Sequence, residues 1–311
     1  MARAAAYASS MPRTDTAARS LVRGSAADLP PAVVAAMAAA APDLAGARWQ
    51  TVTAGSLPWA TYAWGDDADP PVVLVHGVTS NAETFWRVAP AIAAAGRHVV
   101  AVDLPGHGRT GHWQGRRLFA QTAADLAALI MAARLDRPDL AVLGHSWGGL
   151  VVAALPCAGL RPGRLILLDP PALPVGSMEL MTRDPLERPY VELADALAAI
   201  RAASPGWSDG DTRAKALGLT QFDVAAVLAV LLENGDWDGG LAALADAAAD
   251  GIPTWLIRGE SRAGGMVPDA VLPAFERRIG ADHILTIADA PHSPQRLFPE
   301  ATVLAILRAL A

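Results

Sequence analysis

The chain has 311 residues, of which 25 are Lys or Arg and 31 are Asp or Glu, so its formal net charge is −6. This length accommodates one large α/β domain with an inserted lobe as readily as two separate domains. The acidic balance argues against nucleic acid or an anionic membrane as the main partner. With 52% hydrophobic and 18% charged residues, most of the chain is expected to fold into a compact structure.

Cysteine content and the lengths of apolar runs exclude further classes. Cys157 is the single cysteine, so neither an intrachain disulfide nor a cysteine-based metal cage can form. The start of the chain lacks the sustained apolar run of a secretory signal, and the apolar stretch 32–41 is shorter than the roughly 20 residues of a membrane span. We therefore expect a cytoplasmic protein.

The first elements in chain order are an extension and a hairpin. Residues 1–45 are rich in alanine and are predicted to form an N-terminal extension, either a tail or a loosely attached helix. Residues 48–53 and 57–63 flank the turn sequence Ala-Gly-Ser at 54–56. Two such runs around a short turn predict an antiparallel hairpin at one edge of a sheet.

Six continuous apolar runs follow, each typical of a strand that is buried on both faces. They span residues 72–76, 98–103, 140–144, 165–169, 254–258 and 283–287. Longer segments of helical period separate them, at about 81–95, 117–134, 147–158, 268–280 and 294–308. This alternation predicts an α/β fold with a mostly parallel, eight-stranded sheet and helices on both of its faces.

The segment 171–250 breaks the alternation. It contains no apolar strand run, and its helical stretches lie at 191–203, 222–233 and 241–249. We interpret it as a helical cap inserted between two strands of a core that comprises residues 46–170 and 251–311.

A motif with catalytic potential follows the third buried strand. Residues 144–149 read Gly-His-Ser-Trp-Gly-Gly and lie between a predicted strand and a predicted helix. This is the context of a nucleophile elbow, in which glycines permit a sharp turn that exposes the Ser146 hydroxyl. The motif alone is weak evidence because glycine is common in this chain, so the surrounding sequence has to support it.

Three further motifs lie at strand ends. His-Gly-Val at 76–78 closes the first buried strand, and Asp-Leu-Pro-Gly-His-Gly-Arg-Thr at 103–110 closes the second. Asp-Ala-Pro-His-Ser-Pro at 289–294 places His292 between the last strand and the last helix. With these motifs in this order, residues 48–308 resemble the α/β-hydrolase family.

The resemblance implies Ser146 as nucleophile and His292 as general base, with the backbone N–H groups of Val78 and Trp147 as the oxyanion hole. The acid of the triad is less clearly marked. At the position where many family members have an Asp after the penultimate strand, this chain has Arg262. Glu260, at the carboxyl end of that strand, is therefore the first choice, and Asp169, at the end of the strand before the cap, is the alternative.

A cap over Ser146 would contribute apolar pocket walls, although packing within the lobe explains most of its large side chains equally well. We interpret His145 as a packed structural residue rather than as a second base. The candidate pocket residues are His145, Met178, Met181, Trp207, Phe222, Trp237 and Met266. No paired-ligand spacing for a metal and no nucleotide-binding or redox-cofactor motif occurs, so we expect neither a metal nor a cofactor.

These observations predict a cofactor-independent serine hydrolase that cleaves a carboxylic ester or lactone with an apolar acyl or alcohol part through an acyl-enzyme. A thioesterase, an amidase, a carbon–carbon bond hydrolase and an acyltransferase would use the same triad and remain alternatives within the fold. A receptor that binds a small molecule without hydrolysing it is the alternative from another class. The expected partner is a small-molecule substrate, with neither nucleic acid nor a membrane, and the sequence does not indicate an oligomeric state.

Overall fold

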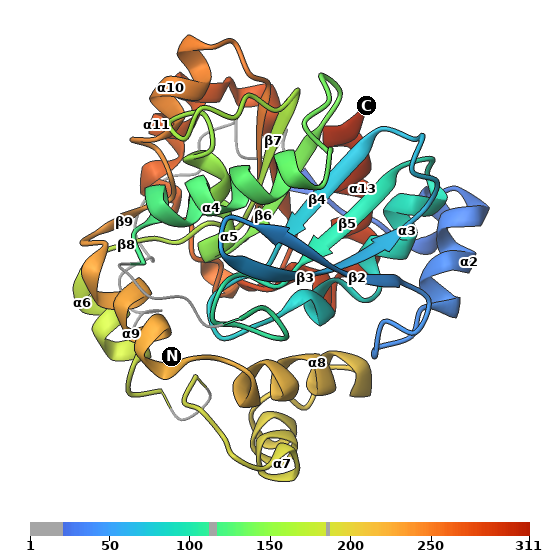
Figure 1. The fold of residues 1–311 in the computed structure, drawn as a ribbon, viewed down its shortest axis with the longest axis vertical. Helices are drawn as coiled ribbons and strands as arrows, with labels where there is room; N and C mark the ends of the chain where they lie inside the picture. Colours follow the sequence, from blue (N-terminus) through green and yellow to red (C-terminus); the bar gives the residue numbers. More distant parts are fainter. Residues whose placement is uncertain (1–20, 112–116, 185–186) are drawn as a thin grey trace.

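The computed structural model describes residues 21–111, 117–184 and 187–311. Its centre is a nine-stranded sheet in the order β1-β11-β10-β7-β6-β4-β5-β3-β2 (Figure 1). The strands are β1 (Leu21–Val22), β2 (Arg48–Ala54), β3 (Leu57–Trp64), β4 (Pro71–Val75), β5 (His98–Val102), β6 (Ala141–His145), β7 (Arg164–Leu168), β10 (Thr254–Gly259) and β11 (Ile284–Ile287). All neighbours pair in parallel except β2 with β3 and β3 with β5, so the expected mostly parallel α/β fold is confirmed.

Helices cover both faces of this sheet (Figure 1). The core helices are α2 (Pro31–Ala39), α3 (Val88–Ala94), α4 (Phe119–Ala132), α5 (Trp147–Ala153), α11 (Leu272–Ile279), α12 (Pro294–Leu297) and α13 (Pro299–Leu310). Short 3-10 turns adjoin them at Ala26–Asp28, Ala82–Phe85, Ser261–Ala263, Asp269–Val271 and Ala281–His283. Helices α4 and α5 pack on one face, and α2, α3 and α13 pack on the other.

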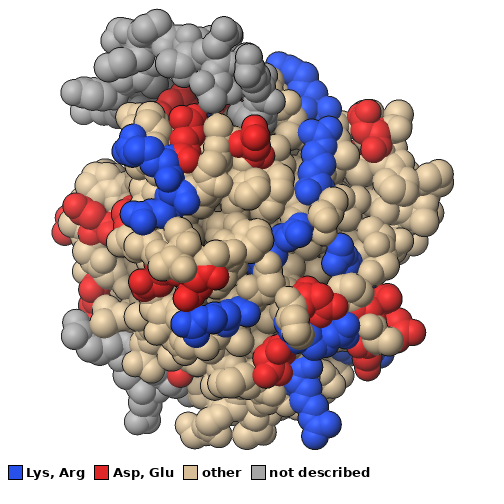
Figure 2. Space-filling model, turned by 90° about the horizontal axis from the view of Figure 1, so that it is seen from above, with Lys and Arg blue, Asp and Glu red and all other residues tan. Residues whose placement is uncertain are grey.

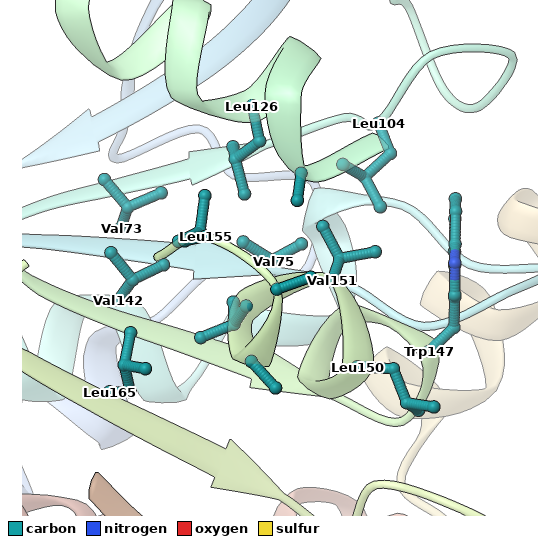
Figure 3. Packing of buried hydrophobic residues seen from close by; sticks show 14 of the residues in the cluster. Val73, Val75, Leu104, Leu126, Val142, Trp147, Leu150, Val151, Leu155 and Leu165 are labelled. Atoms are coloured by element: carbon teal, nitrogen blue, oxygen red, sulfur yellow. The ribbon is translucent and has the colours of Figure 1, made fainter. Parts of the chain in front are cut away.

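Alternation along the strands divides the core between these two faces. In β4, Val73 and Val75 belong to the cluster under α4 and α5, whereas Val72 and Leu74 belong to the cluster on the opposite face. Successive side chains of a strand point to opposite faces, so a strand that is covered twice is apolar throughout. Figure 3 shows Val73 and Val75 beside Leu126 of α4 and beside residues of α5.

The chain between β7 and β10 forms a separate group of helices, which we call the inserted segment (residues 171–250). It contains α6 (Val175–Met181), α7 (Leu193–Ala203), α8 (Asp209–Thr220), α9 (Val224–Glu233) and α10 (Leu244–Ala249), together with the two-stranded pair β8 (Ala172–Leu173) and β9 (Trp237–Asp238). Helices α7 and α8 lie at the bottom of the view in Figure 1, below the sheet.

The N-terminal part differs from the expectation of a loose extension. Residues 1–20 lie outside the described part, but β1 adds a ninth strand by pairing in parallel with β11. Helix α2 follows, and its Val33 and Met37 are buried in the hydrophobic cluster that also contains residues of α3 and α13. Burial of these apolar side chains against the core fixes the segment from residue 21 onward.

The outer surface carries both signs of charge. On the face shown in Figure 2, basic and acidic side chains are interspersed with uncharged surface. Within the described residues, no helix has the length and apolar content that crossing a membrane requires.

Candidate active site

Ser146 lies at the sharp turn between β6 and α5. Its backbone has φ 55° and ψ −126°, a conformation that is strained for a residue with a side chain, and its N–H donates to the Leu168 carbonyl at 2.9 Å. Gly148 makes the turn feasible, because a Cβ there would lie 2.5 Å from the Val75 carbonyl oxygen. The sequence therefore forms the predicted elbow, with Ser146 at its tip.

A chain of two hydrogen bonds leads from this serine into the core. The Ser146 hydroxyl donates to His292 Nε2 at 2.9 Å, and His292 Nδ1 donates to Asp169 Oδ2 at 2.7 Å. The three residues follow β6, β7 and β11, whose carboxyl ends meet at one edge of the sheet. Ser146, His292 and Asp169 are thus arranged as in a Ser-His-Asp triad.

Asp169 is held by the loop that follows β10. It is fully buried and has a positive φ of 46°. Its Oδ1 accepts from the Gly259 N–H at 3.1 Å, and its Oδ2 accepts from the Met266 N–H at 2.9 Å in addition to His292. These amides compensate for the burial of the carboxylate and fix its direction.

The expectation that Glu260 orients His292 is wrong. Glu260 Oε2 instead accepts from the Arg262 guanidinium at 2.6 Å and from the Asp289 N–H at 2.8 Å. Arg262, the residue that departs from the family pattern, binds this carboxylate. The carboxylate that contacts His292 is Asp169, the alternative given by the sequence.

The candidate oxyanion hole adjoins Ser146, because Trp147 is the next residue and a Cβ at Gly77, before Val78, would lie 2.9 Å from Ser146 Cβ. Neither the Val78 N–H nor the Trp147 N–H has a hydrogen-bond partner among the described residues. His76 fixes the turn that carries Val78, since its Nδ1 donates to the Gly77 carbonyl at 2.7 Å and its Nε2 accepts from the Leu104 N–H at 2.9 Å. Burial lowers the pKa of His76 to about 3, so the ring stays neutral and keeps both bonds at neutral pH.

Comparison with known proteins agrees with this geometry. The family model described as "Alpha/beta hydrolase family" matches residues 72–305. The chain belongs to the alpha/beta hydrolase family. The lipase LipV of Mycobacterium tuberculosis is 30% identical over 261 residues, which cover 79% of this chain and 95% of LipV.

Other relatives match in part. A human serine hydrolase-like protein is 34% identical over 131 residues, 40% of this chain and 63% of the relative, so the chain spans less than two thirds of that protein. Among solved structures, E-2-(acetamidomethylene)succinate hydrolase superimposes with a TM-score of 0.71 at 20% identity, covering 85% of this chain and 99% of that one. At 20% identity this structural likeness shows only that the two proteins share a fold.

His145, within the elbow of this hydrolase, supports the backbone of His292. Its Nε2 donates to the His292 carbonyl at 3.1 Å, and the two ring centres are 5.1 Å apart. Burial, reinforced by the neighbouring His292, lowers the pKa of His145 well below its ordinary value. A ring that remains neutral beside the base agrees with the interpretation of His145 as a structural residue.

A polar cluster that the sequence analysis missed adjoins the oxyanion turn. Lys215 of α8 lies 2.9 Å from Thr79 Oγ1 and 2.6 Å from Glu187 Oε2, and Thr79 also donates to Glu187. Burial lowers the pKa of Lys215, and Glu187 opposes this shift. Lys215 is the only lysine in a chain rich in arginine, and this was the one signal in the sequence. The cluster ties the inserted segment to the residue next to Val78.

Three of the candidate pocket residues lie in or against the hydrophobic core. Met178 and Trp237 are buried in the cluster under α4 and α5, and Met181 packs against it. The Trp237 ring meets Phe119 edge-on, with 5.2 Å between the centres. For these residues the structure gives packing contacts, and their role as pocket walls stays a prediction.

The other candidates contact residues around the elbow. The Phe222 ring is tilted against that of His107 with 6.4 Å between the centres, and the His107 ring centre is 5.4 Å from that of Trp147. Trp207 packs on the guanidinium of Arg296, and Met266 supplies the amide that binds Asp169. Phe222, Trp207 and Met266 thus reach the surroundings of the elbow from the inserted segment and from the β10 loop.

Two cavities of the structure lie away from the triad. One cavity of about 360 Å³ lies between α4 and strands β2 to β5, and one of about 240 Å³ lies at β8 and β9. Neither is lined by Ser146, His292 or Asp169. In the part of the chain that the structure describes, no three His, Cys, Asp or Glu side chains are grouped so that they could hold a metal ion.

Proposed function

We propose that this protein is a serine hydrolase that cleaves a carboxylic ester or lactone through an acyl-enzyme. The single observation that carries the proposal is the continuous hydrogen-bond chain from Ser146 through His292 to Asp169. In this scheme Ser146 is the nucleophile and His292 the general base. Asp169 orients the imidazole and stabilises its charged form.

In the first half-reaction, Ser146 Oγ attacks the substrate carbonyl carbon while its proton passes to His292 Nε2. The electron pair of the carbonyl moves to its oxygen, and this oxyanion accepts hydrogen bonds from the N–H groups of Val78 and Trp147. Collapse of the tetrahedral intermediate breaks the bond to the alcohol oxygen. That oxygen takes the proton from His292, and the acyl group stays on Ser146.

The second half-reaction returns the enzyme to its starting state. A water molecule gives a proton to His292 Nε2 and attacks the acyl carbon, and the second tetrahedral intermediate expels Ser146 Oγ, which recovers that proton. An ester yields an acid and an alcohol, and a lactone yields one hydroxy acid.

An ester is favoured over the other substrates of this triad because LipV, a relative over most of its length, is named a lipase. We further infer that the inserted segment acts as a cap and that the substrate has an apolar part. Phe222, near Trp147 through His107, and the partly buried Met181 support the apolar part. A cytoplasmic location and a small molecule as the main partner are part of the same proposal.

The test compares wild type with Ser146→Ala on p-nitrophenyl esters of increasing acyl length and on several lactones, with a fluorophosphonate probe for the serine. We expect turnover and labelling in the wild type, a loss of at least about a thousandfold in rate in the variant, and no labelling there. A protein that neither hydrolyses these substrates nor reacts with the probe, and whose Ser146→Ala variant binds a ligand as well as the wild type does, would instead be the receptor considered as the alternative.

A further inference from the structure

Arg296 is a buried arginine one helical turn beyond His292. It belongs to α12, and only 7% of it is exposed. Its guanidinium carbon lies 4.3 Å from the ring centre of Trp207, in the loop between α7 and α8. The side chain therefore points from the core toward the inserted segment.

Within the described residues this guanidinium has no carboxylate partner of its own. No ion pair of Arg296 occurs there, and its buried Nε has no hydrogen-bond partner. Asp211 and Glu187 are near enough to act on its charge. However, Asp211 is bound by Arg87, and Glu187 is bound by Lys215 at 2.6 Å.

Arg296 is the cation of this group that has no ion pair among the described residues. Arg87 is paired with Asp211 and Lys215 with Glu187, and Asp184 also acts on the charge of Lys215. Burial lowers the pKa of both Arg296 and Lys215, and the Arg296 charge lowers that of Lys215 further. Guanidinium groups stay charged in proteins, and an unpaired buried charge is costly, so Arg296 is poised to accept an anion.

Arg296 and Lys215 approach the surroundings of the triad from two elements. Arg296 follows His292 by four residues, its backbone N–H donates to the Ser293 carbonyl at 3.1 Å, and its charge contributes to the lowered pKa of His145. Lys215 contacts the hydroxyl of Thr79, next to Val78 of the candidate oxyanion hole.

We propose that Arg296 binds a carboxylate carried by the substrate, so that the preferred substrates are anionic esters in which an apolar group separates the ester from a carboxylate on the acyl or the alcohol part. The inference rests on the proposed ester hydrolysis. A guanidinium matches a carboxylate with two parallel hydrogen bonds, and stacking on Trp207 holds its plane. A neutral analogue would leave the buried cation unpaired, which is how a polar site rejects the wrong substrate.

Two matched substrate pairs test the proposal on the wild-type protein. Mono-p-nitrophenyl adipate is compared with p-nitrophenyl hexanoate, which places the carboxylate on the acyl side. The second pair is p-carboxyphenyl butyrate and p-carbamoylphenyl butyrate, with the carboxylate on the alcohol side. After subtraction of the uncatalysed rates, we expect kcat/KM for the anionic member of at least one pair to exceed that of its neutral partner by about tenfold.

The variants are Arg296→Met, Arg296→Lys and, as a control, Arg201→Met, which removes an exposed guanidinium from α7. We expect Arg296→Met to lower the anionic-to-neutral ratio at least about tenfold, mainly through KM, and Arg296→Lys to retain part of it. Arg201→Met should leave the ratio unchanged. If Arg296→Met does not fold, adipate should still slow fluorophosphonate labelling of wild-type Ser146 more than adipamide does.

The outcomes separate this proposal from the one on which it rests. Equal ratios in wild type and Arg296→Met, or no anionic preference in either pair, would overturn the carboxylate site while labelling and neutral-ester turnover left the serine mechanism intact. Absence of both labelling and turnover on every ester would instead remove the proposed function itself, and the carboxylate site with it.

Discussion

At the scale of single residues, the carboxylate beside His292 decides which acid the mechanism uses. We predict that Asp169→Asn lowers kcat by about a thousandfold or more, because an amide at that position no longer stabilises the imidazolium and favours the wrong tautomer. Glu260→Gln should lower it less than about tenfold, since Glu260 binds Arg262 and the Asp289 amide rather than the base. Steady-state rates on one p-nitrophenyl ester measure both.

Thermal unfolding provides the control for this pair, because Asn at 169 would face two backbone N–H groups that now bind a carboxylate. A folded Asp169→Asn protein with nearly full activity, beside a Glu260→Gln protein with little, would return the role of the acid to Glu260.

The difference between the two carboxylates also shows what a sequence reveals about a site. Ser146 and His292 lie in local motifs whose spacing to a strand is visible in the sequence, and the structure brings them within 2.9 Å. The direction of an acidic side chain depends instead on which long-range amides and cations meet it. Asp169 is fixed by Gly259 and Met266, about 90 residues away in the chain, and no local pattern contains that information.

At the scale of elements, the buried strands were predicted to within one or two residues because continuous apolar runs are unambiguous in a sheet covered on both faces. Several elements were missed, namely β1, β8, β9, α6 and α8. Two of them show the physical reasons. Strand β1 has only two residues and acquires its identity from pairing with β11. Helix α8 contains Gly210 and Gly218, which are poor helix formers, and it is stabilised by packing on the core.

Helix α8 accordingly gives the prediction at this scale. Gly210 and Gly176 are each the second residue of a helix, in α8 and α6. A Cβ at Gly210 would lie 2.6 Å from Trp86 Cζ2, whereas a Cβ at Gly176 would meet nothing within 4 Å. We therefore expect Gly210→Ala to destabilise the protein by about 1–3 kcal/mol and Gly176→Ala to stabilise it by about 0.5 kcal/mol.

Denaturant unfolding of the two variants measures these changes. Both substitutions bring the same gain in helix propensity, so the difference between them isolates the contact of α8 with Trp86 and Pro42. That contact includes the hydrogen bond from Trp86 Nε1 to Asp211 at 3.0 Å. Two variants of equal stability would show that α8 does not pack closely against the core in solution.

At the scale of the whole molecule, buried histidines link the free energy of unfolding to pH. Burial lowers the pKa of His107 to about 4, against an ordinary value of 6.5. Between these two pH values the unfolded chain binds a proton that the folded protein does not, so this residue's contribution to stability falls as the pH falls. From pH 7 to pH 5 the loss is about 2 kcal/mol.

Other groups contribute to the same pH range, so the prediction is a difference between two proteins. Burial raises the pKa of Glu83 to about 7, and this group acts in the opposite direction, because the folded protein binds its proton first as the pH falls. Its contribution cancels when wild type is compared with His107→Asn, which can still donate to the Pro105 carbonyl that His107 Nδ1 contacts at 3.2 Å. When the pH falls from 7 to 5, we expect the change in the free energy of unfolding to be about 2 kcal/mol more positive in the variant than in wild type. Urea unfolding at the two pH values measures it, and an identical change in both proteins would mean that His107 takes up its proton in the folded state as readily as in the unfolded chain.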